Sequence, residues 1–234
     1  FARGEIVIIL DAEDRENEGD FICAGEKITP EIVNFMITVG RGQLCMPILP
    51  TIADRLQLKL MVEDNTSPLR TPFTVPLDHR TNKTGITAGE RATTIRAIVD
   101  PNSTPADFVR PGHLFPLISK EGGVLRRAGH TEAAVDLARL AGLTPAGVLC
   151  EILEEGGNRA SRDELFALAA QHDLKITTIE QLIRYRRVRE KLVYRITEAQ
   201  MPTRYGMGVI IGYGVKSESQ QRVVFVIGDL TKTS

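Results

Sequence analysis

Residues 5–20, EIVIILDAEDRENEGD, join an apolar, β-branched run to an acidic segment. Residues 5–10 have the composition of a buried strand, and residues 11–20 hold six acids and one arginine. Crowded carboxylates repel one another unless a cation or a positively charged ligand offsets their charge. Hard divalent ions such as Mg²⁺ take such oxygen ligands. The stretch therefore predicts a strand that delivers a candidate metal-binding loop, with plain solvated surface as the alternative.

Strand and helix signals alternate along the residues that follow. Short apolar runs predict strands at residues 43–47, 148–153 and 175–178. Helices are expected to start at Thr29, Thr87, Thr131 and Ser161, whose hydroxyls can cap a first turn. Two of these starts, TAGE at residues 87–90 and SRDE at residues 161–164, have the spacing of a capping box. Short connections between alternating elements indicate an α/β or intimately mixed α+β fold.

The composition is that of an ordinary globular protein, because 42% of the 234 residues are hydrophobic and 25% are charged. The 29 basic and 30 acidic residues leave a net charge of −1, which argues against a general nucleic-acid-binding protein. No apolar run approaches the length of a membrane span. Three widely spaced cysteines without a C-x-x-C motif exclude a disulfide framework and a structural zinc site. We expect a reducing, cytoplasmic setting, with neither nucleic acid nor membrane as a partner.

The last part of the chain, residues 188–234, has a different sequence pattern. Short strand-like runs separated by turns are expected at residues 192–196, 208–213 and 222–227. This segment is too short for a large core of its own. We therefore expect residues 1–187 to form one domain and residues 188–234 a linker and the start of a second. The basic run at residues 184–191 fits a linker or a solvated helix end better than a nucleic-acid-binding arm.

Residues 126–131, RRAGHT, stand directly before an expected helix. A helix N-terminus offers free N–H groups, and a neighbouring arginine and hydroxyl make it an anion site suited to phosphate. His130 would then reach a metal beside that phosphate. The alternative is an ordinary capped helix with a histidine on its surface.

Glu151 lies within the expected strand at residues 148–153. Strand alternation puts Leu149, Glu151 and Leu153 on one face. Burial on an apolar face raises the pKa of a carboxyl toward values useful in acid–base catalysis. The alternative is a strand end at which the glutamate reaches water.

His113 stands in the stretch RPGHLFP at residues 110–116. Two prolines and a glycine restrict the backbone around this imidazole, which suits a positioned proton carrier in a loop. The alternative is a loop histidine with a structural role. Together with the acidic segment, RRAGHT and Glu151, this residue predicts a metal-assisted reaction on a small phosphorylated compound.

Four blocks of the sequence resemble one family, 3,4-dihydroxy-2-butanone-4-phosphate synthase. In the order expected for that family, they are DRENEGD at 14–20, RPGHLFPL at 110–117, GGVLRRAGHT at 122–131 and AGVLCE at 146–151. The resemblance extends over about residues 4–187. This sequence differs from the family at residues 69–73, LRTPF, where the family usually has a glycine-containing stretch. It also lacks the family's opening helix.

Residues 201–206, MPTRYG, resemble the opening of a GTP cyclohydrolase II domain. The two domains occur fused in bifunctional enzymes of riboflavin biosynthesis. That cyclohydrolase uses zinc held by cysteines, and no cysteine follows Cys150 in this chain. We therefore expect residues 188–234 to be inert toward GTP.

The family resemblance implies a fold and a reaction. The fold is an α+β three-layer α/β/α sandwich with a mixed sheet, followed here by a short β-rich C-terminal fragment. The reaction is that of a lyase, which converts D-ribulose 5-phosphate to L-3,4-dihydroxy-2-butanone 4-phosphate and formate through a metal-stabilised enediolate and a skeletal rearrangement. The cofactor is Mg²⁺, two per site, with Mn²⁺ as a substitute. Members of the family are homodimers whose sites use both subunits.

The resemblance also assigns roles to residues. Glu16 and His130 are the metal ligands, and His113, Glu151 and Asp20 are the catalytic residues. The substrate-binding residues are Arg15, Glu16, Asp20, Thr84, Arg127, Ala128, Gly129, His130, Thr131 and Glu151. Three carboxylates, those of Asp20, Glu18 and Glu151, remain candidates for removing the first proton.

Two other functions fit parts of the sequence. A different metal-dependent isomerase or aldolase acting on a pentose phosphate would use the same enediolate, and formate release separates it from the lyase. A catalytically silent metabolite-binding or scaffold protein would have lost one of the four blocks. None is lost.

Overall fold

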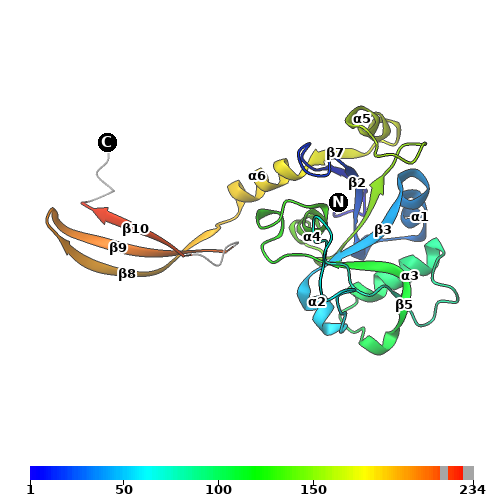
Figure 1. The fold of residues 1–234 in the computed structure, drawn as a ribbon, viewed down its shortest axis with the longest axis horizontal. Helices are drawn as coiled ribbons and strands as arrows, with labels where there is room; N and C mark the ends of the chain where they lie inside the picture. The colour runs from blue at the N-terminus through cyan, green and yellow to red at the C-terminus, as the bar shows by residue number, and fades with distance from the viewer. Residues whose placement is uncertain (217–220, 229–234) are drawn as a thin grey trace. The chain divides into compact units, whose positions relative to one another are not determined.

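Seven strands form a mixed sheet in the larger of two units of the chain (Figure 1). The computed structural model describes residues 1–216 and 221–228, and it divides into the units Phe1–Ile183 and Arg184–Ser234. The sheet has the order β4-β5-β3-β6-β2-β1-β7. Its strands are β1 Val7–Leu10, β2 Gly19–Ala24, β3 Arg41–Ile48, β4 Leu77–His79, β5 Phe108–Ile118, β6 Gly147–Ile152 and β7 Lys175–Thr178. Pairs β1·β7 and β3·β5 are parallel, and the other pairs are antiparallel.

Helices cover both faces of this sheet. Successive strand residues point to opposite sides, so each face has its own set of buried apolar residues. Ile8 and Phe21 belong to one buried cluster, whereas Ile9 and Ile22 belong to the other. The first cluster includes residues of α1 Pro30–Phe35, α2 Pro50–Arg55, α3 Ala88–Val99 and α5 Arg162–Gln171. The second includes residues of α4 His130–Leu140 and of the start of α6 Ile179–Arg189. The predicted three-layer α/β/α arrangement is therefore confirmed.

Two segments predicted as loops contain strands. Asp20 belongs to β2, so the acidic segment ends inside the sheet rather than in the loop. His113 belongs to β5, despite the prolines on either side of it. Pro111 lies where the register of β5 against the short edge strand β4 is irregular, between the partners of Leu77 and Asp78, and prolines are tolerated at such places.

The predicted helix starts are confirmed at Thr29, Thr87 and Ser161, and the start at Thr131 is wrong. Helix α4 begins at His130, and Gly129, in extended conformation, is its N-cap. Ser161 and Glu164 form the predicted capping box. At the start of α3, Thr87 accepts the Glu90 N–H, but the Glu90 carboxylate bonds the preceding loop instead of the Thr87 N–H.

The smaller unit contains a three-stranded antiparallel sheet. Its order is β10-β9-β8, with β8 Val193–Thr203, β9 Gly206–Val215 and β10 Gln221–Ile227, so the three predicted runs lie in strands. Many of its large apolar side chains are exposed, among them Val193, Ile196, Met207 and Val223. Residues 184–189 of the basic run are helical and belong to α6. No helix in the described part of the chain is long and apolar enough to cross a membrane.

Candidate active site

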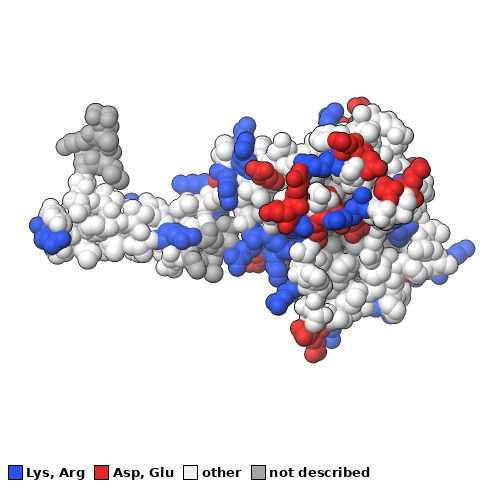
Figure 2. Space-filling view, turned by 45° about the horizontal axis from the view of Figure 1, so that its top comes forward, with Lys and Arg blue, Asp and Glu red and all other residues white. Residues whose placement is uncertain are grey.

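Acidic and basic side chains crowd together on one face of the larger unit (Figure 2). Asp11, directly after β1, organises the acidic loop between β1 and β2. Its buried carboxylate accepts the N–H groups of Glu16 at 3.1 Å and Glu18 at 2.9 Å, and it pairs with the Arg15 guanidinium at 2.8 Å. This residue was not assigned a role from the sequence, although its position after a buried strand was a signal.

Asp20 and Glu151 lie opposite each other on neighbouring strands. Asp20 is buried, and its Oδ1 atom has no hydrogen-bond partner within the described chain. Burial, followed by the neighbouring charge of Glu151, raises the pKa of Asp20 well above its ordinary value. Burial also raises the pKa of Glu151, whose Oε2 atom accepts the Gln43 N–H at 2.8 Å. Both carboxyls therefore bind a proton more readily than the same groups in water.

Glu18, the third candidate for proton removal, lies on the same cavity. Burial and the nearby charge of Glu16 raise the pKa of its carboxyl. The structure thus brings together all three carboxylates that the sequence left open.

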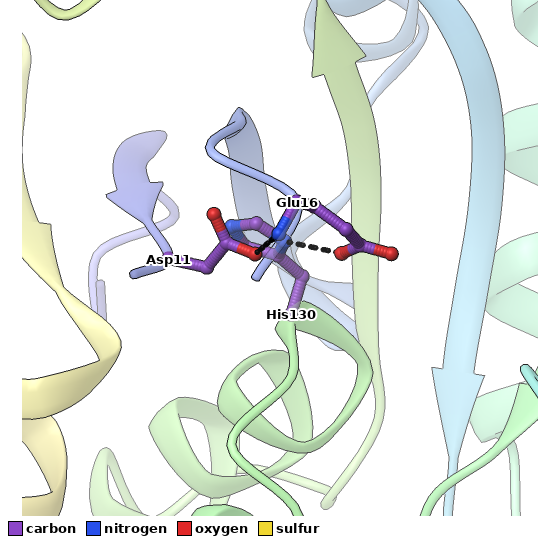
Figure 3. Close-up of side chains that lie close together, drawn as sticks. All are labelled: Asp11, Glu16 and His130. Carbon is purple, nitrogen blue, oxygen red and sulfur yellow. Dashed lines mark hydrogen bonds and ion pairs between the residues drawn. The ribbon is translucent and has the colours of Figure 1, made fainter. Parts of the chain in front are cut away.

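His130 is buried at the start of α4, with its ring directed toward the acidic loop (Figure 3). Its Nε2 atom lies 3.0 Å from the Ile9 carbonyl, which can only accept, so Nε2 carries the proton and Nδ1 has a free lone pair. Burial lowers the pKa of this ring to about 4, which keeps it neutral near pH 7. Nδ1 lies 3.7 Å from Asp20 Oδ2 and 4.0 Å from Glu16 Oε2.

This donor set fits a divalent metal ion. One ligand atom each of Asp11, Glu16 and His130 lie within 4.8 Å of one another. The neutral Nδ1 atom of His130 faces carboxylate oxygens, and no proton is shared between them. A cation can therefore bind between these atoms. Both oxygens of Asp11 accept hydrogen bonds, whereas at Glu16 the Arg15 guanidinium pairs with Oε2, so Glu16 and His130 are the better ligands. Asp20 Oδ2 lies 3.7 Å from His130 Nδ1.

A cavity of about 110 Å³ joins these groups. Its walls are Arg15, Glu16, Glu18, Asp20, Cys45, Thr71, Phe73, Leu117, Arg127, His130, Thr131, Leu149 and Glu151. Thr71 and Phe73 come from the stretch LRTPF, and with Cys45 they were not predicted as site residues. Sequence reasoning missed them because a single threonine, cysteine or phenylalanine outside a recognisable motif carries no chemical signal of its own.

The RRAGHT turn brings a second arginine to the cavity. Arg127 is held by the buried carboxylate of Glu132 at 2.8 Å. Gly129 allows this arrangement, because a Cβ atom there would lie 2.4 Å from the Arg127 guanidinium. Ala128 is exposed and lies outside the cavity, in a groove behind the acidic loop.

His113 and Thr84 are not among the residues that line this cavity. His113 bonds to Asp78, and Thr84 bonds to Glu90 in the loop that packs on Asp78. Asp78 accepts the backbone N–H of His113 at 3.0 Å and lies 2.7 Å from its ring Nδ1. Gly85, next to Thr84, packs so closely that a Cβ atom would lie 1.9 Å from Asp78 Oδ2. The predicted site residues therefore form two clusters within the described chain. Asp78 was missed from the sequence.

Comparison with known proteins points to one family. A family profile described as 3,4-dihydroxy-2-butanone 4-phosphate synthase matches residues 1–185. Proteins named riboflavin biosynthesis protein RibBA from Bacillus cereus (strain AH187) and Bacillus subtilis (strain 168) are 56% and 52% identical to the chain. These matches cover 98% and 97% of the chain but only 58% and 57% of the relatives. The chain thus spans less than two thirds of the length of these relatives.

Solved structures give the same result. RibBX, a two-domain 3,4-dihydroxy-2-butanone 4-phosphate synthase from A. baumannii, superposes with a TM-score of 0.92 at 43% identity, over 99% of this chain and 69% of that one. A 3,4-dihydroxy-2-butanone 4-phosphate synthase in complex with two magnesium ions has a TM-score of 0.76 at 40% identity, over 81% of this chain and 94% of that one.

Proposed function

The chain belongs to the 3,4-dihydroxy-2-butanone 4-phosphate synthase family, and on this premise we propose that it converts D-ribulose 5-phosphate to L-3,4-dihydroxy-2-butanone 4-phosphate and formate in riboflavin biosynthesis. The observation that carries the proposal is the convergence of Glu16, Asp20, His130 and Glu151 on one cavity walled by two arginines. The test is incubation of the purified chain with D-ribulose 5-phosphate and Mg²⁺, with formate as the measured product. A pentose-phosphate isomerase or aldolase would release none.

Each polar group has a place in this reaction. Arg15 and Arg127, both held by carboxylates, offer N–H groups to the phosphate and hydroxyls of the substrate, together with the start of α4. The C3 proton is acidified by the C2 ketone, and a carboxylate of raised pKa can take it and later return it. Asp20, Glu18 and Glu151 are the candidates for this role, because all three line the cavity, whose apolar walls limit the access of water.

The metal in this proposal is Mg²⁺, two ions per site, with Mn²⁺ as a substitute. Glu16 and His130 of this chain would hold it, because Glu16 Oε2 lies 4.0 Å from His130 Nδ1 and His130 is neutral. The ions would supply positive charge beside the substrate oxygens that become negative during the reaction. A related synthase crystallised with two magnesium ions, which supports the number.

The working unit in this proposal is a homodimer with shared sites. His113 and Thr84 belong to a cluster that does not line the cavity, yet both carry predicted roles. A second copy that presents its His113 cluster to the cavity would complete each site, so that every site draws residues from both subunits. Sedimentation at micromolar concentration measures the oligomeric state.

Residues 188–234 form, in this proposal, a linker and the start of a GTP cyclohydrolase II-like domain. The exposed apolar side chains of the small sheet support an incomplete unit. The segment contains no cysteine and should not hydrolyse GTP. A chain ending at about Arg187, within the last turn of α6, should release formate as fast as the full chain. Loss of formate release or of the dimer would show that the segment belongs to the working enzyme.

A further inference from the structure

We propose that Asp78 is a positioning residue, which fixes the ring of His113 so that its Nε2 atom is the one free to exchange a proton with substrate. The inference rests on the proposed function, because it assumes that His113 takes part in the reaction. It assigns a role to a residue that the sequence did not single out.

Asp78 is committed to one partner. It is 5% exposed, and in residues 1–216 and 221–228 its carboxylate hydrogen-bonds only to His113, through the backbone N–H at Oδ1 and the ring Nδ1 at Oδ2. Two contacts from one carboxylate to one residue define both the strand position and the ring orientation. A residue that only held β4 against β5 would need only the contact to the His113 backbone N–H.

The surrounding backbone is shaped for this contact. The register of β4 against β5 is irregular between Leu77 and Asp78, the position at which the carboxylate bonds to His113 of β5. At Gly112 on β5 a Cβ atom would lie 2.1 Å from the Leu77 carbonyl carbon. At Gly85, where φ is +87°, a Cβ atom would lie 1.9 Å from Asp78 Oδ2. Two glycines thus permit the close approach of three segments around a single carboxylate.

The loop that covers Asp78 is itself held in place. The carboxylate of Glu90 accepts the N–H groups of Lys83 at 2.7 Å, Thr84 at 3.1 Å and Gly85 at 3.1 Å. It also accepts the hydroxyls of Thr84 at 2.9 Å and Thr87 at 3.0 Å. Thr84, a predicted phosphate contact, and His113 are therefore presented together by one rigid cluster.

The chemistry follows from donor and acceptor roles. A carboxylate only accepts, so the proton of neutral His113 lies on Nδ1 and the lone pair on Nε2. The side chain of His113 is 45% exposed, so the ring is accessible. A substrate proton can add to Nε2 while Asp78 offsets the positive charge of the imidazolium, and the same proton returns to the substrate in a later step. No net proton is gained or lost.

The decisive variant is Asp78→Asn. It preserves shape and can still accept the His113 backbone N–H, but its amide donates to Nδ1 and moves the ring proton to Nε2. The free enzyme is the sample, and long-range ¹⁵N–¹H spectra of labelled histidines, with His113→Gln for assignment, show which nitrogen is protonated. Turnover of ribulose 5-phosphate and the melting temperature complete the measurement, with exposed Asp100→Asn as the matched control.

We expect the ring proton on Nδ1 in the parent and on Nε2 in Asp78→Asn. We also expect kcat to fall about 10²- to 10⁴-fold, with KM within about twofold and an unchanged melting temperature; Asp100→Asn should match the parent. A parent ring protonated on Nε2, or a variant with kcat within about threefold of the parent, overturns the proposal. Activity lost together with a lowered melting temperature and an unchanged tautomer also overturns it, because the role is then structural. The spectra need no turnover, so a parent that releases no formate refutes the proposed function while the positioning is still decided.

Discussion

Asp20 and Glu151 are Cα partners on the antiparallel strands β2 and β6, and both carboxylates point to the sheet face covered by α4. Like charges directly opposite each other destabilise a sheet. This chain nevertheless places them there, beside the neutral Nδ1 of His130, with one Asp20 oxygen lacking a partner in the described chain. The arrangement is costly for the protein alone and becomes favourable when a cation or a substrate proton joins it.

Removing a predicted metal ligand should abolish turnover without unfolding the chain. Glu16→Gln and His130→Ala each delete one of the atoms that meet at the proposed ion position. We expect no formate release at Mg²⁺ concentrations that saturate the parent, and an affinity for Mg²⁺, measured by calorimetric titration, that falls at least about tenfold. Asp14→Asn, in the exposed part of the same loop, is the control and should behave like the parent. Unchanged metal dependence in either ligand variant contradicts the assignment.

The stability of metal-free protein should increase in Asp20→Asn at neutral pH. The pKa of Asp20 is raised by burial and by Glu151, so the folded state binds this proton more tightly than the unfolded state. The free energy of unfolding of the metal-free parent therefore falls as the pH rises above 3.8, the ordinary pKa of an aspartate. Urea unfolding with a chelator should show the variant more stable at pH 7 and equal to the parent below pH 3.8. A parent that is more stable at pH 7 would contradict this.

Glu151→Gln should bind substrate and release almost no formate. The amide keeps the shape and the contact to the Gln43 N–H but cannot carry the proton of a carboxyl whose pKa is raised. The measurement is single-turnover formate release alongside substrate binding. A rate above about a tenth of normal, a barrier change under about 1.4 kcal/mol, would make the residue structural.

The sequence predicted much of the site because its chemistry is local. Glu16 and Asp20 follow a recognisable strand, and Glu151 alternates with apolar residues, so their meeting in one cavity required only the sheet order. Strand β2 was missed because its first residues belong to the acidic segment, although the whole strand is buried. Asp78 lies on a three-residue strand, too short for any periodicity, and its partner is 35 residues away. Contacts of that kind arise from the fold and not from the local pattern.

Glu90→Gln should lower the melting temperature at neutral pH, and the difference should disappear in acid. Bonds from the Thr84 and Lys83 N–H groups lower the pKa of Glu90 from 4.5 to about 2. A depressed folded-state pKa adds stability that is present above pH 4.5 and is lost as the pH falls toward 2. Melting curves between pH 7 and pH 2 measure this, with exposed Glu121→Gln as the control. A difference that persists at pH 2 would assign the effect to packing.

Mixing two inactive variants should restore activity if sites are shared between subunits. Glu151→Gln disables the cavity cluster, and His113→Gln disables the Asp78 cluster, so each homodimer has two damaged sites. In a mixed dimer one site receives both damaged residues, and the other receives intact residues from each subunit. Random exchange makes half of the dimers mixed, which restores about a quarter of the parent activity. The two purified variants are mixed at micromolar concentration, incubated for exchange and assayed for formate, with each variant alone as the control. If sites lie within single subunits, no mixture recovers activity, and the placement of His113 from the second copy is wrong.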